Sequence, residues 1–264
     1  MRALESKAAI VTGAGDGIGL GIARRFAKAG AKVLVAEINE MTGEAAATGL
    51  RDLGAEAHFL KTDVTRKEQV TAMVDAAIER FGTVDILVNN AWGGTRLGRL
   101  EFKTDETMQR GFAMAFWASH WAMQAAFPAM KAQGWGRIIN ICSLNGVNAH
   151  MYSAEYNVSK EAVRTLTRTA AREWARHGIV ANVICPAAAS TAYRNYLKNN
   201  PENAAAILAT HPMGRMGEPE EDIGGVAVFL AGENARYLTG NTLFVDGGGH
   251  INGVSWAPEL PEGV

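Results

Sequence analysis

The feature that most constrains the fold is a short apolar strand that runs directly into a glycine-rich loop. Residues 8–12 predict the strand, the loop GAGDGIG covers residues 13–19, and residues 20–29 then have a helical pattern that ends at Gly30. This arrangement brings backbone N–H groups and the positive end of a helix dipole against a pyrophosphate. The stretch therefore predicts a dinucleotide site, in preference to a merely flexible glycine turn.

Strands and helices alternate along the rest of the chain. The further apolar runs that predict strands are residues 32–37, 58–61, 85–90, 136–143, 179–185 and 242–245. No composition break suggests a second domain. We therefore expect one doubly wound α/β domain over residues 1–249, with a mostly parallel sheet and helices on both faces, and a C-terminal tail over residues 250–264.

Composition excludes several classes of function. The chain has 26 Lys and Arg against 27 Asp and Glu, so no broad electrostatic attraction to nucleic acid or membrane is expected. No apolar run reaches the ~18 residues of a membrane span, and the N-terminus lacks the apolar region of a signal peptide. Cys142 and Cys185 form no metal-binding pattern and are interpreted as reduced core thiols. We expect a cytoplasmic protein without a metal site.

A second cluster of residues suggests proton-transfer chemistry. Tyr156 and Lys160 lie four residues apart, on one face of a predicted helix, and Ser143 ends a predicted strand. A cation one turn away favours the phenolate, and a serine hydroxyl at the same edge could bind a substrate oxygen. Such a pair also arises by chance on a solvated helix, so its context decides.

Acidic residues follow the first strands. Glu37 ends the second strand twenty residues after Gly17, where a carboxylate can bind the adenosine ribose and repel a 2′-phosphate. Asp16 lies inside the glycine loop and also favours NAD over NADP. The alternative for Glu37 is a solvated charge at a strand end. Asp63 could meet the adenine or simply cap a turn.

Taken together, these motifs resemble the short-chain dehydrogenase/reductase family over residues 6–249. The residues that carry the resemblance are 12–19 (TGAGDGIG), Asp63, Val64, Asn89, Asn90, Ala91, Ser143, Tyr156, Lys160, Pro186, Thr191 and 245–248 (VDGG). The resemblance implies a seven-stranded Rossmann-type sheet of order 3-2-1-4-5-6-7, a nicotinamide cofactor and a homo-oligomer, most often a tetramer.

The family's roles apply to matching positions. Tyr156 would be the general acid/base, Ser143 would orient the substrate oxygen, and Lys160 would bind the nicotinamide ribose and lower the pKa of Tyr156. The other implied cofactor contacts are Gly13, Gly17, Ile18 and Gly19 at the pyrophosphate, Glu37 at the adenine ribose, Asp63 and Val64 at the adenine, Asn89 and Ala91 near the ribose and nicotinamide, and Pro186 and Thr191 at the carboxamide.

The chain departs from the family pattern at three positions. Ala115 stands where the family usually has an Asn that completes a proton relay through water to the Lys. Trp92 replaces the glycine of an NNAG motif, which we expect to reshape the substrate or nicotinamide side of the pocket, and Ala187 follows Pro186 in place of glycine.

The expected function is NAD-dependent interconversion of a secondary alcohol and its ketone. The expected substrate is hydrophobic or cyclic. Candidate pocket residues are Trp92, Asn145, His150, Met151, Tyr152 and Tyr193. One alternative is a 3-oxoacyl-thioester (acyl carrier protein) reductase, which the acidic cofactor loop disfavours because such enzymes usually prefer NADPH. The other is an NAD(H)-binding sensor or scaffold with weak catalysis, suggested by Ala115 and Trp92.

Overall fold

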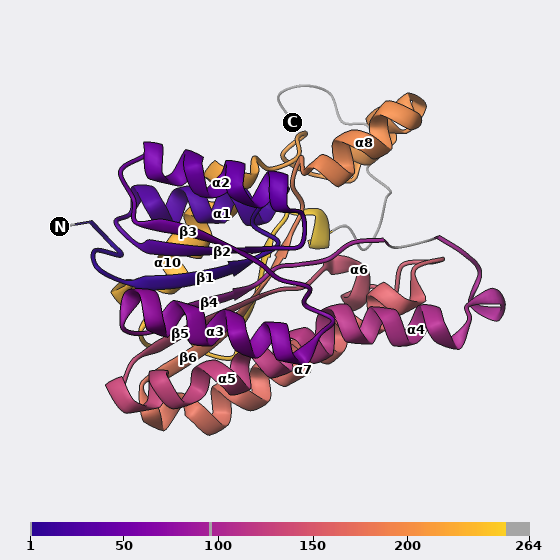
Figure 1. Cartoon of the computed structure of the whole chain (residues 1–264). Coiled ribbons are helices and arrows are strands. Elements are labelled where there is room, and N and C mark those ends of the chain that lie inside the picture. Colours follow the sequence, from indigo (N-terminus) through magenta and orange to yellow (C-terminus); the bar gives the residue numbers. More distant parts are fainter. Residues whose placement is uncertain (1, 95–96, 252–264) are drawn as a thin grey trace, which may run out of the picture.

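The chain folds around one parallel sheet of seven strands in the order β3-β2-β1-β4-β5-β6-β7 (Figure 1). The computed structural model describes residues 2–94 and 97–251, so most of the expected tail lies outside the described residues. The strands are β1 (Ala8–Thr12), β2 (Lys32–Glu37), β3 (Ala57–Lys61), β4 (Ile86–Asn89), β5 (Gly136–Ile141), β6 (Ile179–Pro186) and β7 (Thr242–Val245). The expected strand order is confirmed.

Helices cover both faces of this sheet, as Figure 1 shows. The helices on one face are α1 (Gly17–Lys28), α2 (Glu40–Asp52) and α10 (Gly224–Ala231), and those on the other are α3 (Lys67–Phe81), α5 (Ala118–Gln133) and α7 (Ala154–Trp174). Phe26 and Leu50 are fully buried in the first layer, and Met73 and Met123 in the second. Two apolar cores therefore sandwich the sheet, as in other doubly wound folds.

The apolar stretch over residues 104–133 consists of three helical pieces. They are α4 (Asp105–Phe112), a π-helix (Ala113–Trp117) and α5. Gly111 lets α4 approach α7 closely, because a Cβ there would lie 2.8 Å from the Glu155 carbonyl oxygen. Across residues 2–94 and 97–251, no helix is both long and apolar enough to cross a membrane.

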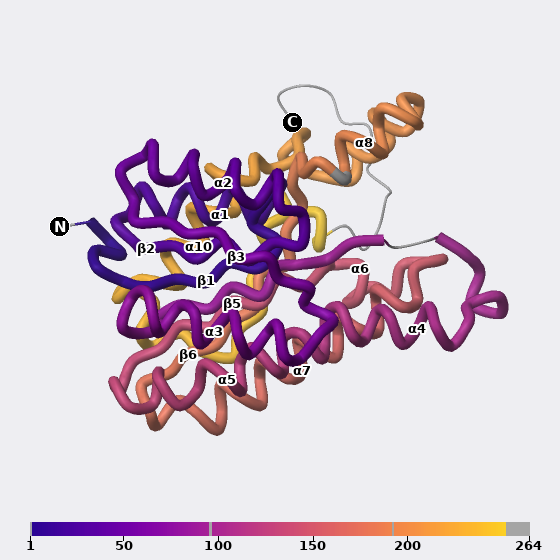
Figure 2. Tube along the Cα trace, viewed as in Figure 1, coloured from indigo at the N-terminus to yellow at the C-terminus, as the bar shows by residue number. Residues whose placement is uncertain are grey.

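Shorter helices leave the sheet at the carboxyl ends of its strands. They are α6 (Leu144–Val147), α8 (Thr191–Asn199) and α9 (Ala204–Ala209). The chain trace in Figure 2 shows α6 and α8 departing from the same edge of the sheet. Ligands bind at this edge in open α/β sheets, so the fold alone directs attention there.

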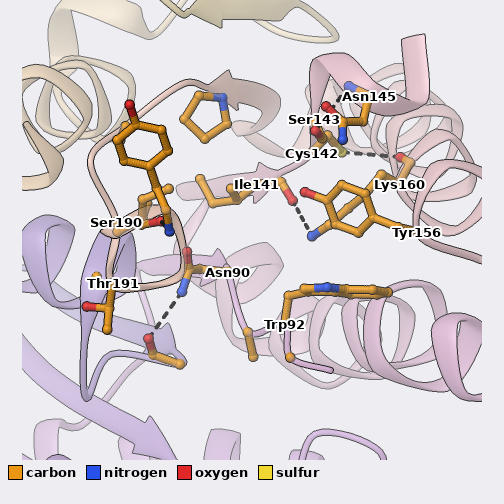
Figure 3. Close-up of a pocket in the computed structure, with 18 of the residues that line it drawn as sticks. Asn90, Trp92, Ile141, Cys142, Ser143, Asn145, Tyr156, Lys160, Ser190 and Thr191 are labelled. Carbon is orange, nitrogen blue, oxygen red and sulfur yellow. Dashed lines mark hydrogen bonds between the residues drawn. The ribbon is translucent and has the colours of Figure 1, made fainter. Parts of the chain in front are cut away.

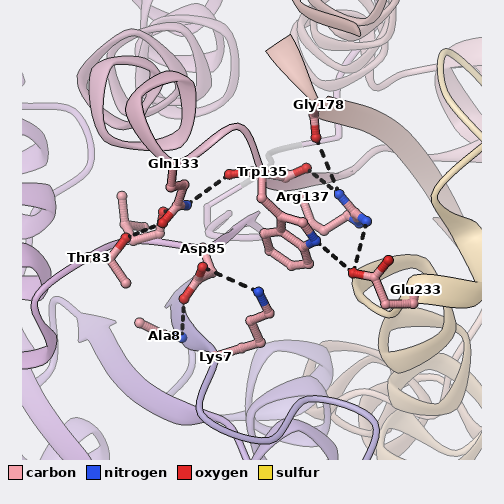
Figure 4. Close-up of polar contacts among 11 residues, drawn as sticks. Lys7, Ala8, Thr83, Asp85, Gln133, Trp135, Arg137, Gly178 and Glu233 are labelled. Carbon is pink, nitrogen blue, oxygen red and sulfur yellow. Dashed lines mark hydrogen bonds and ion pairs between the residues drawn. The ribbon is translucent and has the colours of Figure 1, made fainter.

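At the opposite edge of the sheet, polar contacts join the loops that precede the strands (Figure 4). The Asp85 carboxylate accepts a hydrogen bond of 2.8 Å from the Ala8 backbone N–H, and Lys7 lies 3.7 Å away. Trp135 donates its indole N–H to Glu233 at 2.7 Å, and the Arg137 guanidinium lies 3.6 Å from the same carboxylate. These contacts hold together the loops at the amino ends of the strands, which we call the amino edge of the sheet.

Candidate active site

A cleft of about 1130 Å³ opens at the carboxyl edge of the sheet. It is lined by chain segments that follow β1, β2, β3, β4, β5, β6 and β7. Such a volume exceeds that of an ordinary small-molecule pocket, which suits a dinucleotide together with a second small molecule.

The glycine loop forms the floor of one end of this cleft. Gly13 and Gly17 adopt positive φ angles of 64° and 55°, which glycine reaches without strain. A Cβ at Gly19 would lie 2.1 Å from the carbonyl oxygen of Gly13, so the first turn of α1 packs directly on the loop. The result is a bare backbone cradle at a helix N-terminus, which fits a pyrophosphate.

Asn90 follows β4 and joins this cradle to that neighbouring strand. Its side-chain amide donates to the carbonyl oxygens of Thr12 and Gly13, at 2.9 and 3.2 Å. Figure 3 shows Asn90 between the loop and the centre of the cleft. The sequence assigned cofactor contact to Asn89, but Asn89 does not line the cleft; it is buried and donates to Asn140 at 2.7 Å. Successive side chains of a strand point to opposite faces, which explains the difference.

Asp16 and Thr191 meet across the cleft. The Asp16 carboxylate caps α1 by accepting from the Gly17 N–H at 2.6 Å, and it accepts the Thr191 hydroxyl at 2.7 Å. Thr191 begins α8, so this bond joins the glycine loop to the segment after β6. Both residues line the cleft, as does Pro186.

The far end of the cleft is acidic. Glu37 accepts hydrogen bonds from the backbone N–H groups of Gly15, Ile38 and Asn39, at 3.2, 2.9 and 3.1 Å. Asp63 lines the cleft and accepts from both the N–H and the hydroxyl of Thr65, so it caps this turn, and its contact with the adenine stays a prediction. The lining described around these acids contains no Lys or Arg. A 2′-phosphate would therefore meet negative charge without compensation.

Ser143, Tyr156 and Lys160 converge at the centre of the cleft (Figure 3). Ser143 follows β5 and caps α6, where its hydroxyl accepts the Asn145 N–H at 3.1 Å. Lys160 is buried and donates from Nζ to the Ile141 carbonyl oxygen at 2.8 Å, which places the ammonium 5.8 Å from the centre of the Tyr156 ring. The strand end and the helix face predicted from sequence thus meet.

Burial is the main influence on the pKa values of Tyr156 and Lys160. It raises the pKa of Tyr156 to about 12, and hydrogen bonding to the Ser143 hydroxyl only partly opposes the rise. Burial likewise lowers the pKa of Lys160. The expectation that Lys160 leaves Tyr156 with a lowered pKa is thus wrong for the protein alone, since the desolvation of the phenolate is the larger effect.

Trp92 forms a wall beside the tyrosine. Its ring centre lies 4.8 Å from that of Tyr156, with the planes inclined by 62°, and the Lys160 Nζ lies 5.4 Å from the indole. Edge-to-face aromatic packing and a cation over an indole are both favourable. The bulky substitution expected to reshape the pocket therefore contacts two of the three central residues.

Most of the other predicted residues line the cleft, and some do not. Those that line it are Gly13, Gly17, Ile18, Val64, Ala91, Asn145, His150 and Tyr193. Gly19 lies behind the loop, and Met151 and Tyr152 point to solvent, with 75% and 47% of their surface exposed. Ala149 and Tyr152, on either side of His150 and Met151, have left-handed backbone (φ 50° and 70°).

Ala115 lies in the π-helix and is buried. With Asn89, Ser119 and Lys160 it lines a second cavity of about 10 Å³, close to the smallest space that holds one water molecule.

Within the part of the chain that the structure describes, no group of three His, Cys, Asp or Glu side chains is arranged to hold a metal ion.

The cleft is also lined by residues to which the sequence analysis gave no role in the site. They include Asn90, Arg110, Met114, Asn148, His211 and Asp246. The alternation rule could have selected Asn90. Arg110 lies in α4 and Met114 in the π-helix that follows it, and both elements pack on α7, a tertiary contact that no local pattern shows.

Fold and site together define an α/β protein of the Rossmann type, with a large cleft and a cluster of polar side chains at the carboxyl edge of its sheet. Comparison with known proteins is more specific. Residues 13–250 match a family model described as enoyl-(acyl carrier protein) reductase. The chain belongs to the short-chain dehydrogenase/reductase family of oxidoreductases.

Individual relatives cover nearly the whole chain. It is 40% identical to galactitol 2-dehydrogenase (L-tagatose-forming) of Cereibacter sphaeroides and 37% identical to 2,3-dihydroxy-2,3-dihydro-p-cumate dehydrogenase of Pseudomonas putida; each match covers 93% of this chain and 95% of the relative. The crystal structure of an NAD+-bound xylitol dehydrogenase matches with a TM-score of 0.87 and 29% identity, over 93% of this chain and 99% of that one.

Proposed function

We propose that the protein oxidises a secondary alcohol to its ketone with NAD as hydride acceptor. The observation that carries this proposal is the convergence of Ser143, Tyr156 and Lys160 in a cleft that also contains the glycine cradle. The dehydrogenases among its relatives support the reaction class.

The residues present fit such a cofactor. The cradle of Gly13 and Gly17 would hold its pyrophosphate, and Glu37 its adenine ribose. When bound, the nicotinamide supplies the hydride acceptor. The preference for NAD rests on the acidic Glu37 end of the cleft, and the NAD+-bound relative is consistent with it.

The protein's own residues would manage the oxygen and its proton. The Ser143 hydroxyl donates a hydrogen bond to the substrate oxygen and fixes its position. Tyr156, as phenolate, would accept the hydroxyl proton while the carbinol carbon loses hydride. At neutral pH only a small fraction of Tyr156 is in this form in the cofactor-free protein, because burial raises its pKa to about 12. The Lys160 ammonium, held against the Ile141 carbonyl, stabilises the phenolate charge during this transfer.

The substrate is expected to be a cyclic or hydrophobic alcohol. Trp92 and Tyr193 give the cleft aromatic walls, and Met114 adds an apolar surface. A relative that acts on a dihydrodiol is consistent with this shape of substrate, whereas a relative that acts on galactitol extends the panel to polyols. We expect a homo-oligomer that buries the exposed Trp117 and Val158.

The test is a panel of cyclic alcohols, dihydrodiols and polyols assayed with NAD and with NADP. Tyr156→Phe should lower kcat by about 10²–10⁴-fold without weakening NADH binding, because only the proton acceptor is lost. Undiminished turnover in Tyr156→Phe would contradict the assignment. NADH binding without turnover of any alcohol or ketone would instead favour a sensor or scaffold.

A second candidate is reduction of an acyl-carrier-protein thioester, which the description of the matched family model favours. It predicts activity with a 3-oxoacyl or enoyl thioester and NADPH. The acidic residues Asp16 and Glu37 argue against it, and the same panel with these thioesters separates the two.

A further inference from the structure

The charged residues of the cleft are divided between its two ends. The carboxylates of Asp16, Glu37 and Asp63 lie at the end of the glycine loop and the adjoining strands. Beyond Tyr156, the lining contains Arg110, together with His150 and His211. Asp246 is the acid described on that side, and it pairs with the His250 ring at 2.9 Å. Among these residues Arg110 carries a fixed positive charge, because a guanidinium stays protonated in proteins.

Two glycines leave space around Arg110 and its helix. Gly111, the next residue of α4, permits the close approach to α7 described above. Gly94 has a φ of 83°, and a Cβ there would lie 3.0 Å from the Nη2 of Arg110. The guanidinium thus lies against the loop that follows β4, in space that a side chain at position 94 would fill.

Two carboxylates of the α4 region, those of Glu106 and Glu155, have other partners. Glu106, one turn earlier in α4, is bound by Thr104 and its own backbone N–H at the start of the helix. Glu155, which faces Gly111, forms a buried ion pair of 2.7 Å with Lys103. Within residues 2–94 and 97–251, no carboxylate lies within 4 Å of the Arg110 guanidinium. Its planar fork of donors is suited to a carboxylate from outside.

The chain sets the distance between Arg110 and the reaction centre. Trp92 contacts the Tyr156 ring, and Gly94, which contacts Arg110, is two residues further on. Two Cα–Cα steps span at most roughly 7.6 Å. A carboxylate on a ring-sized substrate whose carbinol carbon lies beside Ser143 and Tyr156 is therefore within reach of the part of the cleft that contains Arg110.

We propose that Arg110 is a specificity-determining residue that binds a carboxylate of the substrate, so that the preferred substrates are cyclic hydroxy acids with the carboxylate several bonds from the reacting carbon. This inference rests on the proposed alcohol dehydrogenase function. It adds an anionic group to the substrate class and assigns the group that recognises it.

The kinetic test compares 3-hydroxycyclohexanecarboxylate with its neutral methyl ester, in wild type and Arg110→Gln. We expect the variant to lose at least tenfold in kcat/KM for the acid, through KM, and less than twofold for the ester. Arg110→Lys should retain part of the preference. Arg236→Gln removes the same charge from an exposed residue outside the cleft lining and should leave kcat/KM unchanged for both substrates. Equal losses for acid and ester in Arg110→Gln would overturn the proposal.

A binding test does not depend on turnover. Cyclohexanecarboxylate, which has no alcohol to oxidise, is titrated into the NADH-loaded protein by calorimetry. We expect Arg110→Gln to bind it at least tenfold more weakly than wild type, and equal affinities would overturn the proposal. Lack of turnover with retained Arg110-dependent binding would count against the dehydrogenase function and leave the carboxylate site in place.

Discussion

Trp92 provides the sharpest test of the reaction centre, because it contacts both Tyr156 and Lys160. In Trp92→Gly the edge-to-face pair is lost, which is worth about 0.5–1.5 kcal/mol, together with the cation–indole contact, about 0.5–2 kcal/mol. The free energy of unfolding should fall by roughly 1–3.5 kcal/mol. For a chain of this size the Tm then decreases by about 2–14 °C.

The same substitution should change the protonation of Tyr156. Burial raises its pKa to about 12, and removal of the indole admits water to the ring. Water stabilises the phenolate, so the pKa of Tyr156 should move down toward its ordinary value of about 10. At a fixed pH below both values, each unit of this shift increases the phenolate population tenfold.

The assay is an ultraviolet titration of tyrosinate in the cofactor-free protein, with Tyr156→Phe in each background to isolate the signal of Tyr156. Thermal unfolding gives the stability change. Trp92→Phe keeps an aromatic ring beside Tyr156 and should show smaller changes in both measurements. A Trp92→Gly protein with an unchanged Tm and a Tyr156 pKa still near 12 would refute the reasoning.

Three further predictions concern the cofactor loop, helix packing and the α4 region. Glu37→Gln should raise the ratio of NADP to NAD efficiency by about 10–100-fold, since one charge at 4 Å from a phosphate is worth up to roughly 4 kcal/mol; a fixed ratio would exclude Glu37 as the selector. Gly19→Ala should abolish NADH binding or folding, because its Cβ would overlap the loop, whereas Gly49→Ala, with open space in α2, should stabilise the protein by about 1 kcal/mol in chemical denaturation. Lys103→Ala should destabilise the protein by about 3–5 kcal/mol at neutral pH by leaving Glu155 buried and unpaired, and Glu155→Gln in that background should recover part of the loss.

The sequence predicted the parallel sheet well, because buried strands are continuous apolar runs and glycine loops mark where they end. β2 and β7 have the predicted bounds, and β5 ends two residues before Ser143, which the strand prediction had included. The Tyr156–Lys160 spacing likewise fixed their common helix face. These features depend on local pattern, which a single sequence contains.

The substrate side was less predictable, because it depends on tertiary contacts. Met151 and Tyr152 were expected in the pocket and do not line it, and the left-handed backbone at Ala149 and Tyr152 has no glycine that could mark it in the sequence. Arg110 was missed because its place depends on the close packing of α4 on α7. The pKa of Tyr156 was predicted in the wrong direction because burial is a property of the folded chain.

The polar contacts at the amino edge have a consequence for motion. The loops that enter β1, β4, β5 and β6 are joined by contacts of Asp85, Trp135, Arg137 and Glu233. We therefore expect displacements of the helices to be small at this edge of the sheet and to increase toward the cleft. Amide hydrogens should therefore exchange slowly at the starts of the strands and faster around residues 186–217, so that the cleft can open while the sheet stays intact.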